Sequence, residues 1–402
     1  KLAASAIIFI FLIPYTASLY NGLSRLFGMA FDIDYTVCVI VMAVLTGVYV
    51  IAGGYMATAI NDFIQGIIMI FGICAVIGAV LASQGGFLAA LEGLAQVPVD
   101  ASAGPVAAPG VFASFFGPDP LNLLGVVILT SLGTWGLPQM VQKFYAIKSE
   151  SAINKGMIIS TVFALIVSGG CYFLGGFGRL FSDKMQFNPD GSIAGGFDSV
   201  IPTMLSGLPD LLIAIVVILV LSASMSTLSS LVLASSSTLT LDFLKDNIIK
   251  DMDEKRQVRI MQGLIVVFIA ISVVLAIIQY KSSVTFIAQL MGVSWGALAG
   301  AFLAPFLYGL YWKKTTKLAC WASFLFSTVV MVANIFVRSS FPTLLQSPIN
   351  AGAFCMLAGL VIVPVVSLFT PQTNRALVEN AFSCYDKKVT VRQSEALGDQ
   401  VD

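Results

Sequence analysis

One segment of the chain, residues 221–242, combines many hydroxyl side chains with an otherwise apolar run. It carries eight serines and three threonines and follows apolar residues that begin near Leu211. On a helix with about 100° per residue, five residues share one face and Thr227 flanks it: Ser222, Ala223, Ser226, Ser229 and Ser230. Several neutral oxygens without nitrogen or sulfur ligands suit a small hard cation. Serines in membrane helices also serve close packing and back-bond to carbonyls, which would account for residues 235–238 without any ligand.

Asp62 is the one acidic residue close to the body of an apolar run, in the sequence GGYMATAINDFIQG at 53–66. A charge within the hydrocarbon is expensive and therefore indicates a functional site. The alternative is that Asp62 caps a helix that starts at Phe63, where a carboxylate accepts from free backbone N–H groups. Combined with the hydroxyl face, a single carboxylate suits sodium better than a divalent ion.

Two places in the chain predict interruptions of membrane helices. Residues 131–139, SLGTWGLPQ, hold two glycines and a proline inside a run long enough to span a membrane. Interrupted helices mark binding sites in secondary transporters because their ends present free backbone groups, although a proline kink for packing is the alternative. A weaker interruption is expected at Gly292–Gly296, next to Gln289, where packing is an equal explanation.

The composition indicates a polytopic α-helical membrane protein. Of 402 residues, 58% are hydrophobic and 10% are charged, and none is histidine. Soluble domains carry about 25% charged residues, and the ten-residue alternation of a β-barrel is missing from this sequence. The net charge of zero gives no electrostatic reason to expect nucleic acid as a partner. The six cysteines have no metal-ligand spacing, so neither a disulfide framework nor a zinc site is indicated.

Ten membrane spans are expected, and basic residues predict their orientation. The spans are 2–27, 36–53, 60–83, 120–141, 156–181, 209–241, 259–280, 284–311, 318–338 and 350–370. If Lys1 is cytoplasmic, alternate connections near 54–59, 142–155, 242–259 and 312–317 and the tail from 371 are inside. With Lys1, these places hold 16 of the 21 lysines and arginines. Short helices are also expected outside the membrane at Phe87–Leu94 and near SVIPTML, residues 199–205.

Four motifs resemble those of the sodium:solute symporter family, whose members carry proline, pantothenate, sialic acid or sugars. GGYMATAINDFIQGIIM at 53–69 resembles the pattern GG…TD..Q, with Asn61 in place of the usual threonine. ASMSTLSS at 223–230, continuing to TLDF, resembles the cation-binding helix of the family. WGLPQMVQKFYAIKS at 135–149 and GLYWKKTTKLA at 309–319 are also similar. The resemblance covers roughly the first 340 residues.

The resemblance implies an all-α transporter fold of two inverted five-helix repeats, with the N-terminal helices of the first repeat lying before Lys1. The symporter domain would cover residues 1–371, and 372–402 would form a cytoplasmic tail. Within the domain, 1–83 would end the first repeat, 120–311 would form the second, and 318–370 would add two helices.

The resemblance also implies the roles of particular residues. Ala223 through its carbonyl, Ser226 and Thr227 match a sodium site common to the family. A second sodium site, found in some members, corresponds to Asp62, Ser229 and Ser230. The positions that match solute or gate residues are Tyr15, Ser131, Thr134, Trp135, Gln139 and Gln289.

The expected function is sodium-driven uptake of a small neutral or zwitterionic solute, such as an amino acid or a carboxylate-bearing metabolite. Alternatives are a channel or a sensor built on the symporter fold. An intramembrane enzyme is not expected, because the chain has no histidine and only one candidate acid to serve as a general acid or base. The expected partners are sodium, the solute and membrane lipid, with no organic cofactor. The protein is expected to be a monomer in a prokaryotic cytoplasmic membrane.

Overall fold

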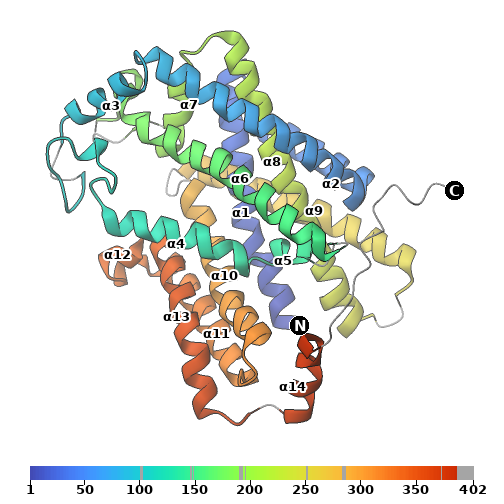
Figure 1. The fold of residues 1–402 in the computed structure, drawn as a ribbon. Coiled ribbons are helices and arrows are strands. Elements are labelled where there is room, and N and C mark those ends of the chain that lie inside the picture. Colours follow the sequence, from blue (N-terminus) through green and yellow to red (C-terminus); the bar gives the residue numbers. More distant parts are fainter. Residues whose placement is uncertain are drawn as a thin grey trace.

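The computed structural model describes residues 1–386 except 100–102, 145–146, 148, 190–192, 195, 250–251, 283–286 and 373. This part of the chain is built of helices (Figure 1). The long ones are α1 Leu2–Phe31, α2 Tyr35–Ser83, α4 Pro120–Gly136, α6 Glu150–Gly176, α8 Asp210–Thr238, α9 Glu254–Ser282, α10 Ile287–Tyr311, α11 Lys317–Phe336 and α13 Pro348–Phe369. Within the described residues, nine helical segments are long and apolar enough to cross a membrane, and α2 supplies two of them.

Helix α2 contains both of the spans expected at 36–53 and 60–83. The helix is continuous from Tyr35 to Ser83, so the connection expected at 54–59 is itself helical. The Asn61 amide nevertheless donates a hydrogen bond of 2.9 Å to the Tyr49 hydroxyl. A straight helix would separate these residues by about 18 Å along its axis, which two side chains cannot bridge. The helix therefore bends between them, and its halves remain separate membrane segments.

The interruption expected in residues 131–139 is confirmed. Helix α4 ends at Gly136, Leu137 is extended with ψ 124°, and α5, Pro138–Phe144, begins directly afterwards. Proline has no N–H to donate to the preceding turn, and its fixed φ suits the first position of a helix. The expected span 120–141 is thus divided between the 17 residues of α4 and the seven of α5.

No interruption occurs at Gly292–Gly296, where α10 is continuous, and packing explains the glycines. A Cβ at Gly296 would lie 2.6 Å from the Gly352 Cα of α13, and one at Gly292 would lie 2.9 Å from the Ile349 amide nitrogen. Small residues at such places let two membrane helices approach closely. Helices α10, α11 and α13 accordingly lie side by side (Figure 1).

The largest apolar core among the described residues joins α1, the first half of α2, α8, α9 and α10, and it extends to α4, α11 and α13. Fully buried side chains from these helices include Leu12, Tyr20, Leu228, Phe268 and Leu298. Helix α8 is therefore an interior helix over its second half, and part of its hydroxyl face is directed inward.

Both short helices expected outside the membrane are present. Helix α3 covers Phe87–Gln96, and α7 covers Val200–Leu205 after the 3-10 turn Phe197–Ser199. Two further short α-helices are α12, Thr343–Gln346, and α14, Arg375–Phe382, and a π-helical segment, Leu239–Lys245, continues α8.

Candidate cation and solute site

A carboxylate of α2 meets the hydroxyl face of α8. The Ser226 hydroxyl of α8 and the Lys143 ammonium of α5 both lie near enough to the Asp62 carboxylate to stabilise its charge. One oxygen of the carboxylate, Asp62 Oδ1, is buried and has no hydrogen-bond partner among the described residues. A buried polar oxygen without a donor is costly, and a bound cation would remove that cost.

The hydroxyls around Ser226 donate to carbonyls of their own helix. Thr227 Oγ1 donates to the Ala223 carbonyl at 3.0 Å, while Ser229 Oγ and Ser230 Oγ donate to the Ser226 carbonyl at 3.0 and 3.1 Å. A hydroxyl that donates its proton keeps two lone pairs as acceptors. Back-bonding therefore leaves these oxygens able to coordinate a cation, and it fixes their orientation.

Gln65 offers a further oxygen that could coordinate a cation. It lies on the same helix as Asp62, three residues along and on the same face. Its Oε1 is also buried without a partner among the residues that the structure describes. We did not predict a role for this residue from the sequence, although it occupies the glutamine position of the pattern GG…TD..Q. It adds a neutral acceptor to the environment of the carboxylate.

Tyr15, expected at the solute site, contacts a tryptophan that the sequence analysis did not select. Its ring lies edge-on to the Trp295 ring with centroids 5.6 Å apart. Trp295 packs against Gly133 of α4, where a Cβ would lie 2.9 Å from the indole. The indole is 8% exposed, and its Nε1 has no acceptor among the described residues. The only sequence signal was its place inside Gly292–Gly296.

Two of the expected solute residues lie on the outer face of α4. Ser131 is exposed and Trp135 is 57% exposed, one turn apart on one side of the helix. Thr134 is half-buried and donates to the Ser131 carbonyl at 3.1 Å. Because Gly133 and Gly136 form the side of α4 that packs on α10, these three residues stand outside that contact.

Gln139 of α5 and Gln289 of α10 each bury an amide oxygen that has no partner among the described residues. The two residues lie at different heights along the shared direction of α4 and α10. Gly133 packs on Trp295 and Gly136 packs on Ala299, so α4 and α10 run in the same direction. Gln289 precedes this contact and Gln139 follows it, so the structure does not place both amides at one point beside Tyr15.

These features define a class of protein: a helical membrane protein of many spans, in which an interrupted helix lies beside a helix with a polar oxygen-rich face. A model of the sodium:solute symporter family matches residues 1–326, and the chain belongs to this family.

Curated relatives are similar over most of this chain. The sodium/proline symporter of Haemophilus influenzae is 30% identical over 343 residues, which cover 83% of this chain and 64% of the relative. The sodium/pantothenate symporter of the same species is 25% identical over 318 residues, covering 78% and 61%. The chain thus spans less than two thirds of the length of these relatives.

A solved structure of a Na+-coupled sialic acid symporter, in a substrate-bound outward-open state, shares the fold. It superposes with a TM-score of 0.64 at 15% sequence identity, covering 92% of this chain and 75% of the other. At this identity the likeness concerns the arrangement of helices.

Proposed function

We propose that this protein is a secondary transporter that couples inward sodium flow to the uptake of a small organic solute by alternating access. The observation that carries the proposal is the meeting of Asp62 and Ser226, which come from helices far apart in the sequence. Their contact leaves one buried carboxylate oxygen without a donor. Membership of the sodium:solute symporter family supports sodium as the ion.

We assign two overlapping sodium positions to α8. The first uses the Ala223 carbonyl and the hydroxyls of Ser226 and Thr227. The second uses the Asp62 carboxylate with the hydroxyls of Ser229 and Ser230, and Gln65 Oε1 supports it. Sodium is a hard cation, and these groups supply only oxygen. Ser226 takes part in both positions. It lies near the Asp62 carboxylate, and its carbonyl accepts from the Ser229 and Ser230 hydroxyls.

We propose that α5 moves relative to α4 during transport, at the break between the two helices. The backbone at Leu137 is extended, and Pro138 cannot bond to the preceding turn. Helix α5 carries Lys143, whose charge acts on Asp62. Sodium at Asp62 would weaken that attraction and so bias the position of α5. Each sodium ion that enters gains about 2.3 kcal/mol per 100 mV of membrane potential.

The proposed solute is small and carries a carboxylate, either as an amino-acid zwitterion or as another carboxylate-bearing metabolite. The unpartnered indole N–H of Trp295, at the contact with Tyr15, is a donor suited to a carboxylate oxygen. The named solutes of the relatives, proline and pantothenate, both contain such a group. We place the protein in a bacterial cytoplasmic membrane, with its C-terminus inside.

Uptake into proteoliposomes by the full-length protein tests the proposal. Candidate amino acids, pantothenate, sialic acid and sugars are supplied with an inward gradient of sodium, lithium or protons. We expect accumulation of one solute class with sodium, and its loss when an ionophore collapses the sodium gradient. Uptake that is equal with and without sodium would refute sodium coupling.

A further inference from the structure

A cavity of about 240 Å³ opens between α1, α10 and α11, at the end of the molecule where α10 ends and α11 begins. Its wall on α11 consists of residues spaced i, i+3, i+4 and i+7, which form one stripe of a helix. They are Lys317, Cys320, Trp321 and Phe324. Helix α10 adds Phe302 and Pro305, and α1 adds alanines 3 and 4. The interior is therefore apolar and aromatic, with a cation at one end.

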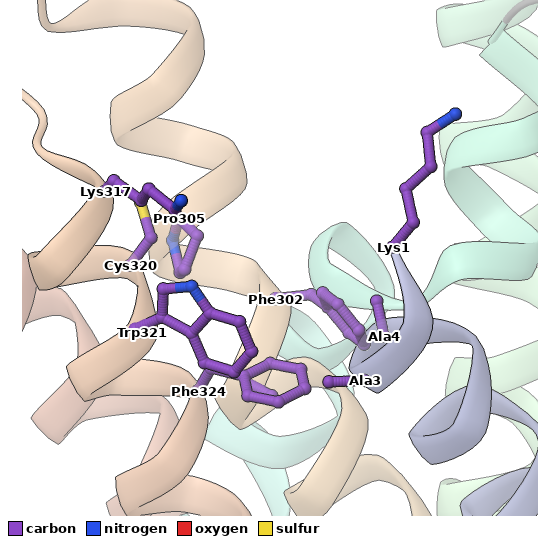
Figure 2. A pocket seen from close by; sticks show the side chains of 10 residues that line it. Lys1, Ala3, Ala4, Phe302, Pro305, Lys317, Cys320, Trp321 and Phe324 are labelled. Atoms are coloured by element: carbon purple, nitrogen blue, oxygen red, sulfur yellow. The ribbon is translucent and has the colours of Figure 1, made fainter. Parts of the chain in front are cut away.

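The aromatic residues form a continuous wall. The Phe302 and Phe324 rings are 5.6 Å apart, and the Phe324 and Trp321 rings are 5.4 Å apart, both edge to face. Figure 2 shows the Phe302 and Phe324 rings toward Ala4 and Ala3, with Trp321 farther from both alanines. Trp321 remains 41% exposed, and tryptophan with one apolar and one wet side is typical of the membrane–water interface.

The charge at this end is positive and partly unpaired. Lys1 forms an ion pair of 2.9 Å with Asp246, and its side chain extends away from the rings (Figure 2). Lys317 forms no ion pair within the part of the chain that the structure describes. Lys313 and Lys314 stand just before it on the same exposed connection. Of these three lysines only Lys317 lines the cavity, so its ammonium is the cationic rim of the apolar space.

We propose that this cavity is a binding site for one anionic phospholipid. Its acyl chain occupies the apolar space beside Phe302 and Phe324, and its phosphate is bound by the Lys317 ammonium at the rim. Phe324 lies about 10 Å below Lys317 along α11, which matches the step from the headgroup region into the hydrocarbon. Basic pockets between membrane helices on the cytoplasmic side are suited to anionic headgroups, and the basic residues of this chain place the rim on that side.

The test uses phospholipids whose acyl chains are brominated, because bromine quenches tryptophan fluorescence on contact. The full chain is reconstituted in phosphatidylcholine vesicles that contain brominated phosphatidylglycerol or brominated phosphatidylcholine. The signal of Trp321 is the difference between the wild type and Trp321→Phe. We expect half-maximal quenching at about a five-fold lower mole fraction of the anionic lipid, the factor that corresponds to about 1 kcal/mol per basic side chain.

The variant Lys317→Gln should remove this preference for the anionic lipid, and Lys317→Arg should retain it. Lys255→Ala is the matched control, because Lys255 is an exposed lysine at the start of α9 that does not line the cavity. Equal quenching by both lipids, or equal effects of the Lys317 and Lys255 variants, would overturn the proposal. Absence of Trp321 quenching by either lipid would show that protein covers the cavity. Displacement by inorganic phosphate alone would assign the rim to a free anion instead of a lipid.

Discussion

The Arg25 guanidinium of α1 lies 3.9 Å from the Asp198 carboxylate, and both side chains are largely buried, at 14% and 8% exposed. The same carboxylate accepts from the Ile287 amide at the beginning of α10, with both oxygens at 3.1 Å. Arg25 Nε also donates to the Asn21 amide oxygen at 3.0 Å, and its guanidinium lies over the Tyr280 ring of α9. Asp198 thus joins the C-terminal part of α1 to the beginning of α10. Arg25 adds a contact with the C-terminal part of α9.

This arrangement predicts a pH dependence of stability. Burial raises the pKa of the Asp198 carboxyl, while the bond from Ile287 and the charge of Arg25 act in the opposite direction. With a folded pKa above the unfolded value, Asp198 contributes most below its unfolded pKa and loses that contribution as pH rises through the folded pKa. The stability of the wild type relative to Asp198→Asn, which does not titrate, should therefore fall as the pH rises above about 4, the ordinary pKa of an aspartate. Thermal midpoints in detergent measure this difference; a difference that rises with pH would contradict the prediction.

The contact of Gly296 with Gly352 predicts that α10 and α13 tolerate no added methyl group there. Gly296→Ala would place a Cβ 2.6 Å from a backbone atom, which forces the helices apart. Such overpacking costs about 1–3 kcal/mol, so the thermal midpoint should fall. Gly309→Ala, in the same helix with open space at its Cβ, should leave the midpoint unchanged or raise it slightly. Equal midpoints for both variants would show that the approach of α10 and α13 is looser than described.

The bend in α2 predicts a short distance between two positions twelve residues apart. In a background without native cysteines, Tyr49→Cys with Asn61→Cys should be joined by a short bifunctional thiol reagent. Thr36→Cys with Val48→Cys is the control pair, because it has the same separation within the first half of α2. A straight segment places those two residues about 18 Å apart, so cross-linking should fail. Failure of the first pair would indicate an unbent helix.

The second sodium position predicts the effect of changes at Asp62 and Gln65. Asp62→Asn removes the only carboxylate of the site, and the Hill coefficient for sodium in uptake should fall toward one. Gln65→Leu keeps a side chain of similar size but removes its neutral oxygen. It should raise the half-maximal sodium concentration about ten-fold or more, since a single bond to a charge contributes about 1.5–3 kcal/mol. Cooperative sodium dependence that survives Asp62→Asn would exclude a second ion at this carboxylate.

Sequence patterns predicted the architecture well because membrane spans depend on composition over many residues. The hydropathy runs located the spans, and Gly136 with Pro138 located the break after α4. The helical connection in α2 was not predicted, because two apolar runs separated by residues 54–59 were interpreted as two spans with a connection between them.

The candidate site was only partly predictable, because contacts between distant helices leave no local pattern. The sequence could place Ser226 and Thr227 on one face of α8, but it could not show that Asp62 faces Ser226. Trp295 had no separate signal, because a tryptophan within a glycine-rich apolar run is also expected in any close helix contact. Only packing against Gly133 and the edge-on contact with Tyr15 distinguish it.

Sodium binding to the Ser226→Ala variant tests the central claim most directly. Binding of radioactive sodium to the purified full-length protein requires neither a known solute nor a membrane gradient. Ser226→Ala should raise the half-saturating sodium concentration at least ten-fold, because the hydroxyl belongs to both proposed positions, while Ser237→Ala, at the end of the same helix, should leave it unchanged. Equal sodium affinity of Ser226→Ala and the wild type would contradict the assignment of the α8 hydroxyl face as the cation site.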